Sequence, residues 1–411
     1  MRNARVIIFA VPRPVHVNPL LSISEVLVRR GFHVTCVTSD IFEPAVSAVG
    51  ARVMRCPRLV TPNERSTVNY GSLSCDEAVV DFENLARRTI SRLTPFFENG
   101  RPDLVLYDSH SFAGLILASR HNIPAVHITT QLIFKADRFE EERETSEFAR
   151  EMLNLNCYID ALFREQGVAL LDAIFRKELL NIYLYAKDFQ ICNDSGAESA
   201  FYAPRCVAER PCMHTWRPTY APNVPAVLVS ASTTLVQNPD YYLMCAEVLS
   251  NLGWHVILAI GDNNNPAQFS QLPPNCEVSK NVPQVEIMPY VQLLVCLGGM
   301  TTTMEAMYHG VPLVMLTHGF NEGELYAGNV ARLGLGIHLR SSPVTADNLR
   351  YAVLDIMTNR EILRQVREMQ LLIRRAPGAE EVVNRIEEFL ESHVPFKTYA
   401  PDANLTAGMS G

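Results

Sequence analysis

The chain has 411 residues, which predicts two or three domains, each large enough to bury a core of its own. Its formal net charge of −8 argues against a nucleic-acid partner, which normally requires a basic patch. No apolar run reaches the roughly 18 to 20 residues that span a bilayer, and the ten cysteines include no C-x-x-C pair. We therefore expect a cytoplasmic protein with free thiols and without a membrane span, a disulfide framework or a zinc site.

The first half of the chain alternates strand-like and helix-like segments. The expected strands cover 6–11, 33–37, 51–56, 103–107, 125–128 and 189–193. The expected helices cover 18–30, 77–97 and 112–120. Such alternation predicts a parallel sheet with right-handed crossovers, in an α/β fold. Residues 135–187 are long, charged and helical in pattern, and we interpret them as a helical insertion.

Five prolines between 203 and 225 indicate a linker between two halves. The predicted boundaries are an N-terminal domain at 1–205, a linker at 206–225, a C-terminal domain at 226–394 and a tail at 395–411. The expected strands of the second half are 226–230, 255–260, 293–296 and 312–316. Its expected helices are 241–252, 301–309 and 324–333, with two or three more between 346 and 393. The last helix is a candidate for packing back on the N-terminal domain, and ligands are expected at the strand ends between the two domains.

One segment, V-C-L-G-G-M-T-T-T-M-E at 295–305, combines an apolar strand, a glycine turn and the start of a helix. Gly298 and Gly299 permit close backbone approach to a ligand, and Thr301 and Thr302 add hydroxyls to the helix N–H groups. The pattern is typical of a cradle for the diphosphate of a nucleotide. It also fits a capping box between Thr302 and Glu305, which would need no ligand.

The surrounding motifs favour the cradle. Pro283-Gln284 precedes it, Gly310-Val-Pro312 follows it, and Glu322-Gly-Glu-Leu follows that. This order resembles the donor-binding signature of the GT-B family-1 glycosyltransferases, the UDP-glycosyltransferase-like group that includes bacterial macrolide and other natural-product enzymes. The resemblance implies two Rossmann-like domains facing each other across a cleft. It implies that Val282 contacts the base of the donor, and that Gly299, Thr301 and Thr302, with Gly298 beside them, contact the diphosphate. Glu305 would bind the ribose, and Glu322 would bind the sugar.

The N-terminal half carries a second motif of the same family. Pro14-Val-His16-Val-Asn-Pro19 follows the first strand and is similar to the family segment G-H-x-N-P, with Val15 in place of glycine. The resemblance implies that His16 is the catalytic base, a task suited to an imidazole at a strand end. Asp108 ends another strand and would orient it. A structural role for His16, and an N-cap role for Asp108 before the helix at 112, are the alternatives.

Ser230-Ala-Ser-Thr233, after the first strand of the second half, resembles the family turn S-x-G-(S/T). Ser232 replaces the glycine there. Ser230 and Thr233 are therefore candidate donor contacts, and a plain strand-end turn is the alternative of similar weight.

Three positions depart from the family pattern on the donor side. Leu297 stands where the family has a histidine that binds the diphosphate, and leucine has no hydrogen-bond donor to offer. Gly323 stands in place of a glutamine, and Asn281 stands where an aromatic ring often stacks on the base. Either the donor is unusual, or donor binding has decayed.

These residues together predict an inverting, metal-independent hexosyltransferase with no cofactor. It would move a sugar from a UDP or dTDP donor to a hydroxyl of a small apolar natural product, as in macrolide-type antibiotic biosynthesis, with the acceptor under the 135–187 insertion. The main alternative is a catalytically weakened GT-B protein that helps another transferase. A sugar-nucleotide epimerase and a phosphorylase are weaker alternatives. The sequence leaves the sugar, base and acceptor open, as well as transfer to oxygen, nitrogen or carbon and the oligomeric state, a homodimer included.

Overall fold

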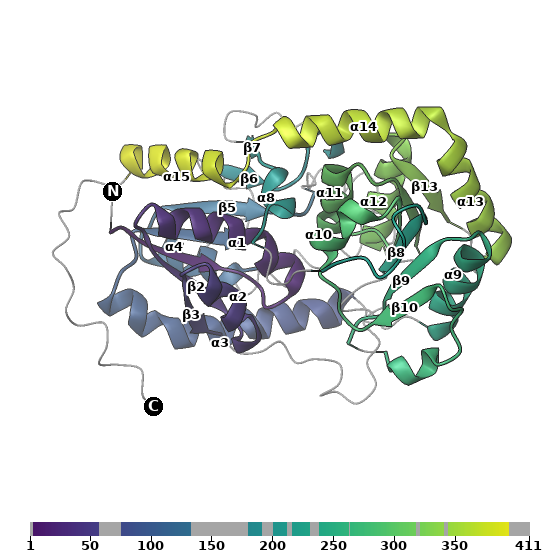
Figure 1. Ribbon diagram of the computed structural model, residues 1–411. Helices are drawn as coiled ribbons and strands as arrows, with labels where there is room; N and C mark the ends of the chain where they lie inside the picture. The colour runs from purple at the N-terminus through teal and green to yellow at the C-terminus, as the bar shows by residue number, and fades with distance from the viewer. Residues whose placement is uncertain are drawn as a thin grey trace, which may run out of the picture.

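The computed structural model describes residues 3–56, 75–132, 180–190, 200–211, 216–230, 238–262, 264–317, 321–340 and 344–393. They form two α/β lobes, each built on one parallel sheet (Figure 1). The first sheet ends with a strand at Ala200–Tyr202, and the second begins with a strand at Ala226–Ser230. The predicted domain limits at 205, 225 and 394 remain predictions. No described helix is long and apolar enough to cross a membrane.

The N-terminal lobe contains a seven-stranded parallel sheet in the order β3-β2-β1-β4-β5-β6-β7. Its strands are β1 Arg5–Phe9, β2 His33–Thr38, β3 Arg52–Arg55, β4 Leu104–Asp108, β5 Ala125–Thr129, β6 Asn181–Tyr183 and β7 Ala200–Tyr202. Its helices are α1 Pro14–Arg29, η1 Asp40–Phe42, α2 Glu43–Ala48, α3 Cys75–Asn99, α4 Phe112–Arg120, η2 Lys187–Phe189 and α8 Arg205–Ala208. The central strands β1 and β4 are apolar on both faces, because α1 covers one face and α3 with α4 covers the other.

The C-terminal lobe contains a six-stranded parallel sheet in the order β10-β9-β8-β11-β12-β13. Its strands are β8 Ala226–Ser230, β9 His255–Ala259, β10 Cys276–Ser279, β11 Leu293–Cys296, β12 Leu313–Leu316 and β13 Gly336–Leu339. Its helices are α9 Pro239–Asn251, η4 Pro266–Phe269, α10 Gln284–Ile287, η5 Met288–Tyr290, α11 Met300–His309, α12 Asn321–Arg332, α13 Ala346–Thr358, α14 Arg360–Arg375 and α15 Ala379–His393. The strand order reverses between β8 and β11, which is where open α/β sheets bind ligands.

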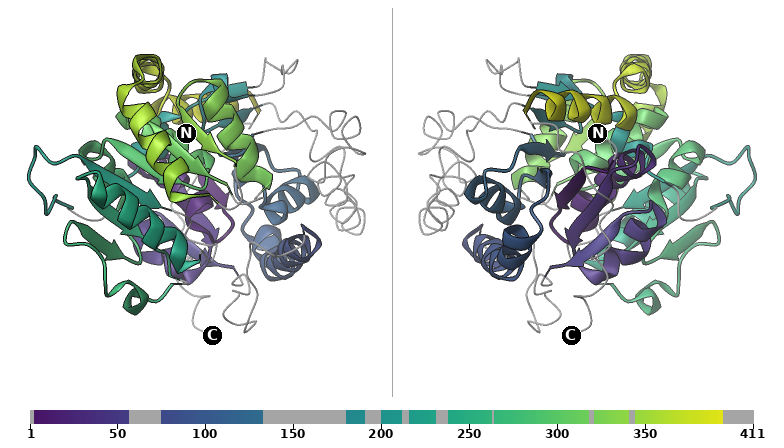
Figure 2. Two further views of the ribbon diagram at one scale, coloured as in Figure 1. Left: turned by 90° about the vertical axis from the view of Figure 1, so that its right-hand side faces the viewer. Right: turned by 90° about the vertical axis from the view of Figure 1, so that its left-hand side faces the viewer.

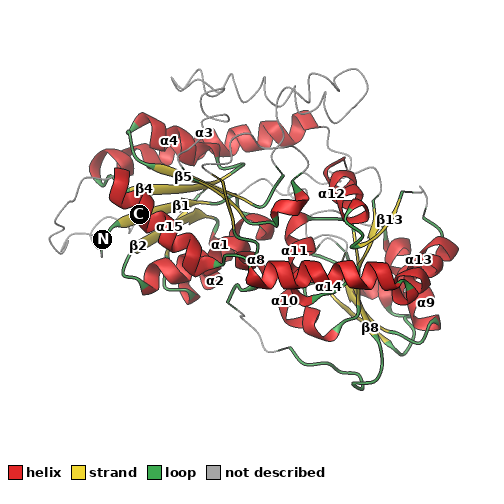
Figure 3. Cartoon of the chain, turned by 90° about the horizontal axis from the view of Figure 1, so that it is seen from above, coloured by secondary structure: helices red, strands yellow, loops and turns green. Residues whose placement is uncertain are grey.

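Two helices connect the lobes. The short helix α8 packs against both α1 and α11, and Figure 3 shows it between the two lobes. The last helix, α15, leaves the C-terminal lobe and packs against α1, as the two views in Figure 2 also show. Arg30, at the end of α1, forms ion pairs of 2.6 Å with Glu380 and with Glu387 of α15. The helix that carries His16 is therefore held by elements from both sides.

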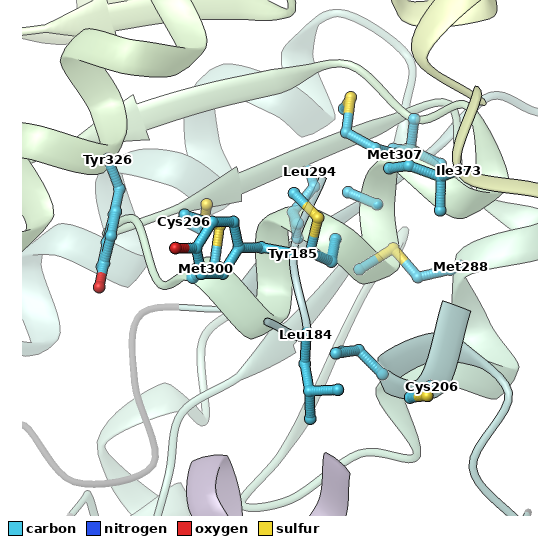
Figure 4. Packing of buried hydrophobic residues seen from close by; sticks show 14 of the residues in the cluster. Leu184, Tyr185, Cys206, Met288, Leu294, Cys296, Met300, Met307, Tyr326 and Ile373 are labelled. Atoms are coloured by element: carbon cyan, nitrogen blue, oxygen red, sulfur yellow. The ribbon is translucent and has the colours of Figure 1, made fainter. Parts of the chain in front are cut away.

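The lobes also share a buried apolar interface, shown in Figure 4. Leu184 and Tyr185, just after β6, lie close to Met300 at the start of α11, and all three belong to one hydrophobic cluster. The backbone N–H of Ala186 donates to the sulfur of Met304 over 3.4 Å. Since this cluster runs through both sheets, the relative position of the lobes is determined by close packing as well as by the linker.

Several local predictions were wrong. The strand expected at 189–193 is absent from its described part, because Lys187–Phe189 forms a 3₁₀ turn. A real strand, β6, lies at 181–183, inside the predicted helical insertion, and most of that insertion lies outside the described residues. Three-residue strands are too short to show the alternation by which strands are recognised. Strands β7, β10 and β13 and helix α8 were missed for similar reasons of length, α8 lying in the segment expected to be linker.

Candidate active site

His16 and Asp108 meet at the carboxyl edge of the first sheet. His16 lies in the first turn of α1, which begins at Pro14 because proline is well suited to the first helical position. Asp108 is the last residue of β4, the neighbour of β1. His16 Nδ1 lies 3.4 Å from Asp108 Oδ1, and each side chain is only 7% exposed. The structure thus brings the two predicted catalytic residues together.

Asp108 accepts three further hydrogen bonds from nearby groups. The backbone N–H of Val11 donates over 2.7 Å, the N–H of His110 over 2.8 Å and the hydroxyl of Ser111 over 2.9 Å. Burial by itself would raise the pKa of Asp108, but His16, His110 and the Val11 N–H outweigh it and lower the pKa to about 2. The carboxylate is therefore ionised and can only accept. The alternative that Asp108 is the N-cap of α4 is wrong, because Ser111 occupies the N-cap position.

A second histidine stands beside this pair. The ring of His110 meets the ring of His16 edge to face, with centroids 5.3 Å apart. Burial lowers the pKa of His110 to about 3, so its imidazole is neutral near neutral pH. One ligand atom from each of His16, Asp108 and His110 lies within 4.8 Å of the others, a spacing that could hold a metal ion. The predicted absence of a metal is thus a question for experiment.

Ser109, the residue after Asp108, begins a row of hydrogen-bonded polar side chains on the other face of β4. Ser109 Oγ lies 3.0 Å from His127 Nε2 and donates to Thr129 Oγ1 over 2.6 Å. His127 Nδ1 lies 3.2 Å from Asn181 Oδ1, and burial lowers the pKa of His127 to about 4. Sequence reasoning missed this row. The available signal was a serine directly after one predicted strand and a histidine in the next.

An apolar pocket lies near the same edge, between β1, β2 and the helices α3 and α4. Its wall includes the residues Phe9, Val11, Pro12, Val37, Leu85, Ala86, His110, Ser111, Phe112 and Ala113. His110 therefore contributes both to this wall and to the surroundings of His16. The region at 135–179, under which the acceptor was expected, lies outside the described residues.

In the C-terminal lobe, β11, a glycine turn and α11 form the predicted strand–turn–helix. Gly298 has φ of +91°, and a Cβ there would lie 3.1 Å from the carbonyl oxygen of Gly323, so two glycine backbones approach each other closely. Gly299 is the N-cap of α11 with an ordinary φ of −114°. Thr301 and Thr302 are half-buried in the first turn. The free N–H groups of this turn suit an anion.

Glu305 lies one turn further along α11 and is 1% exposed. Arg210, which follows α8, forms an ion pair with its Oε1. Gln284 Nε2 donates to Glu305 Oε2 over 2.5 Å and to Thr302 Oγ1 over 3.3 Å. The capping-box alternative was wrong, since α11 begins before Thr302 and Glu305 bonds to side chains. Arg210 was missed, because its segment was expected to be linker and nothing in the sequence marks its partner.

The remaining predicted positions are spread over the same lobe. Ser230 ends β8 and Val282 precedes α10, and both are half-buried. Leu297 is 6% exposed and belongs to the apolar cluster. Asn281, in the place of the aromatic ring, donates to Asp262 Oδ1 over 2.7 Å. Thr233 and the side chain of Glu322 lie outside the described part, although Glu322 itself belongs to α12.

Comparison with known proteins places this geometry in context. Residues 244–389 match the family model for the C-terminal domain of erythromycin biosynthesis protein CIII-like proteins. The NDP-glycosyltransferase YjiC of Bacillus licheniformis is 30% identical over 394 residues, covering 95% of this chain and 98% of its own. The oleandomycin glycosyltransferase of Streptomyces antibioticus is 28% identical, covering 93% and 90%. The crystal structure of CalG4, the calicheamicin glycosyltransferase, superposes with a TM-score of 0.77 at 26% identity, covering 96% of this chain and 100% of its own.

Proposed function

The chain belongs to the GT-B family-1 glycosyltransferases of the natural-product type, and we propose that it transfers its sugar with inversion, using His16 as base and Asp108 as its partner. The observation that carries this proposal is the buried His16–Asp108 contact at the sheet edge. Asp108 is ionised and held by backbone N–H groups, so it is a fixed acceptor for the Nδ1 proton of His16. That arrangement leaves Nε2 to take the proton of the acceptor hydroxyl.

The proposed step is a single displacement at the anomeric carbon. The acceptor oxygen forms a bond to that carbon as its proton passes to His16 Nε2. The bond from the carbon to the diphosphate oxygen breaks on the opposite face, and the diphosphate leaves with the electron pair. Asp108 stabilises the resulting imidazolium through its charge. Attack and departure on opposite faces give inversion.

We propose that the donor is a UDP or dTDP sugar bound at α11. The N–H groups of the first turn of α11, with Thr301, Thr302, Gly298 and Gly299, would hold the diphosphate and stabilise it as it leaves. In the remaining assignments, Val282 contacts the base, Glu305 the ribose, Ser230 and Thr233 the phosphate or sugar, and Glu322 the sugar. The helix terminus supplies the charge stabilisation that a metal would otherwise give, so we propose that neither a metal nor a cofactor is required.

The acceptor is proposed to be a small apolar molecule with a reactive hydroxyl. The support is the row of apolar side chains from β1, β2, α3 and α4 that lies beside His110, next to His16. The cavity between them is about 20 Å³, room for about one water molecule, so we take it as the side from which the acceptor approaches and not as the acceptor site itself. A cytoplasmic location is proposed with this role, on composition alone.

The direct test supplies UDP and dTDP sugars with a panel of apolar hydroxylated acceptors, in the presence of a chelator, and analyses products by mass spectrometry and NMR. Inverted glycosides formed without metal are the expected result. Nucleotide binding without any product would favour the helper alternative, for which the departures at Leu297 and Gly323 are the argument. A changed sugar nucleotide without acceptor would indicate an epimerase, and a dependence on inorganic phosphate would indicate a phosphorylase.

A further inference from the structure

The ion pair between Arg210 and Glu305 joins the two halves of the chain. Arg210 directly follows α8, which packs on α1 of the N-terminal lobe, whereas Glu305 belongs to α11 of the C-terminal lobe. The Glu305 side chain is 1% exposed and the Arg210 side chain 16%. The charge of Glu305, a proposed donor residue, is thus matched from outside the donor lobe.

A carboxylate at this depth needs partners to remain charged. Transfer of an unpaired carboxylate from water into a protein interior is costly, and such groups take up a proton instead. Arg210 supplies the compensating charge at Oε1, and Gln284 supplies a neutral hydrogen bond at Oε2. Gln284 alone cannot replace the guanidinium, because an amide carries no charge.

The two partners also determine how the carboxylate is oriented. Each carboxylate oxygen can accept about two hydrogen bonds. With Arg210 on one oxygen and Gln284 on the other, each oxygen keeps capacity for one further donor. Two vicinal hydroxyls, such as those of a ribose, supply such a pair of donors. Gln284 also reaches Thr302, so the carboxylate and the predicted diphosphate contact belong to one hydrogen-bonded network.

We infer that Arg210 is a positioning residue for the donor nucleotide, which matches the charge of Glu305 and orients its carboxylate to accept hydrogen bonds from the sugar hydroxyls of the nucleoside. The inference rests on the proposed donor role of Glu305. It adds a residue from the segment between the lobes to the donor site. The guanidinium acts through Glu305 and is not itself assigned a contact with the donor.

The test measures dissociation constants of UDP and dTDP by calorimetry for the full chain. In Arg210→Met, Glu305 loses its charged partner and the bond that orients it, so affinity should fall by roughly tenfold to a hundredfold, the range for a lost hydrogen bond to a charged group. Arg210→Lys should restore most of the affinity. In the Glu305→Gln background, Arg210→Met should cause no further loss, because the guanidinium acts through Glu305.

Arg205→Met is the matched control. Arg205 lies on α8, the short helix just before Arg210, and pairs at 3.0 Å with Glu209. It should bind both nucleotides as the unchanged protein does. Circular dichroism and thermal melting of each variant separate loss of fold from loss of affinity. If the unchanged protein binds neither nucleotide, the proposed function fails. If it binds, and folded Arg210→Met binds equally well, the role of Arg210 is refuted while the proposed function stands.

Discussion

The two lobes each bury a carboxylate at their proposed site, but they satisfy it in different ways. Asp108 is bonded by two backbone N–H groups and by Ser111, all from its own sheet edge. Among the described residues, Glu305 is bonded by the side chains of Arg210 and Gln284, which come from other segments. Backbone bonds hold a group in one place, whereas side chains can change rotamer. The contrast fits a rigid base partner in one lobe and a carboxylate that admits a ligand in the other.

The largest expected effect comes from removing the base. His16→Ala should lower kcat by about a hundredfold to ten-thousandfold, the usual contribution of general base catalysis, and leave the KM for the donor almost unchanged. Steady-state kinetics, with the donor and acceptor that the product assay identifies, would measure both. The exposed His33, changed to alanine, is the control. Full transfer by the folded His16 variant would show that the base assignment is wrong.

The next effect concerns acid stability, to which a buried histidine of the N-terminal lobe contributes. Burial lowers the pKa of His127 from 6.5 to about 4, so the unfolded chain binds a proton there at a pH where the folded chain does not. Stability from this group is complete above pH 6.5 and is lost as the pH falls toward 4, by up to about 3 kcal/mol.

Urea unfolding at several pH values would measure this slope. His127→Asn should remove its share of the slope. An unaltered slope in the His127 variant would mean that this histidine is protonated equally in both states.

A smaller effect is expected in the glycine turn of the donor lobe. Gly298→Ala places a Cβ at φ of +91° and against the Gly323 carbonyl, and should lower the free energy of unfolding by about 1–2 kcal/mol. Gly299→Ala is the matched control, because its φ is −114° and no atom lies within 4 Å of the added carbon. Chemical denaturation compares the two directly. Equal stability of the two variants would contradict the close backbone approach.

The smallest effect sharpens the contrast on the donor side. Leu297→His should strengthen nucleoside-diphosphate binding by roughly tenfold, because a hydrogen bond to a charged group outweighs the desolvation of the ring in an apolar cluster. Calorimetry with UDP and dTDP would detect it. Weaker binding would instead mean that the site has been reshaped for a different donor, with Leu297 as part of its wall.

The amino-acid sequence determined the fold class and, through the family motif around His16, predicted the proposed catalytic pair. Alternation of apolar strands and helices is a local signal, and a parallel sheet places all strand carboxyl ends at one edge. Residues that directly follow or end strands, such as His16 and Asp108, could therefore be expected to meet. The glycine turn before α11 was predictable for the same reason, since turn chemistry is local.

Only the tertiary structure decided which partners these groups have. Arg210 reaches Glu305 because α8 packs between α1 and α11, an arrangement that no local pattern records. His127 meets Asn181 because β6 lies beside β5, although a long segment separates them in the chain. Local residue preferences determine helices, strands and turns, whereas the pairing of buried polar groups depends on how those elements pack. The sequence therefore located the proposed base and the proposed phosphate cradle, and the packing of the lobes brought Arg210 to Glu305.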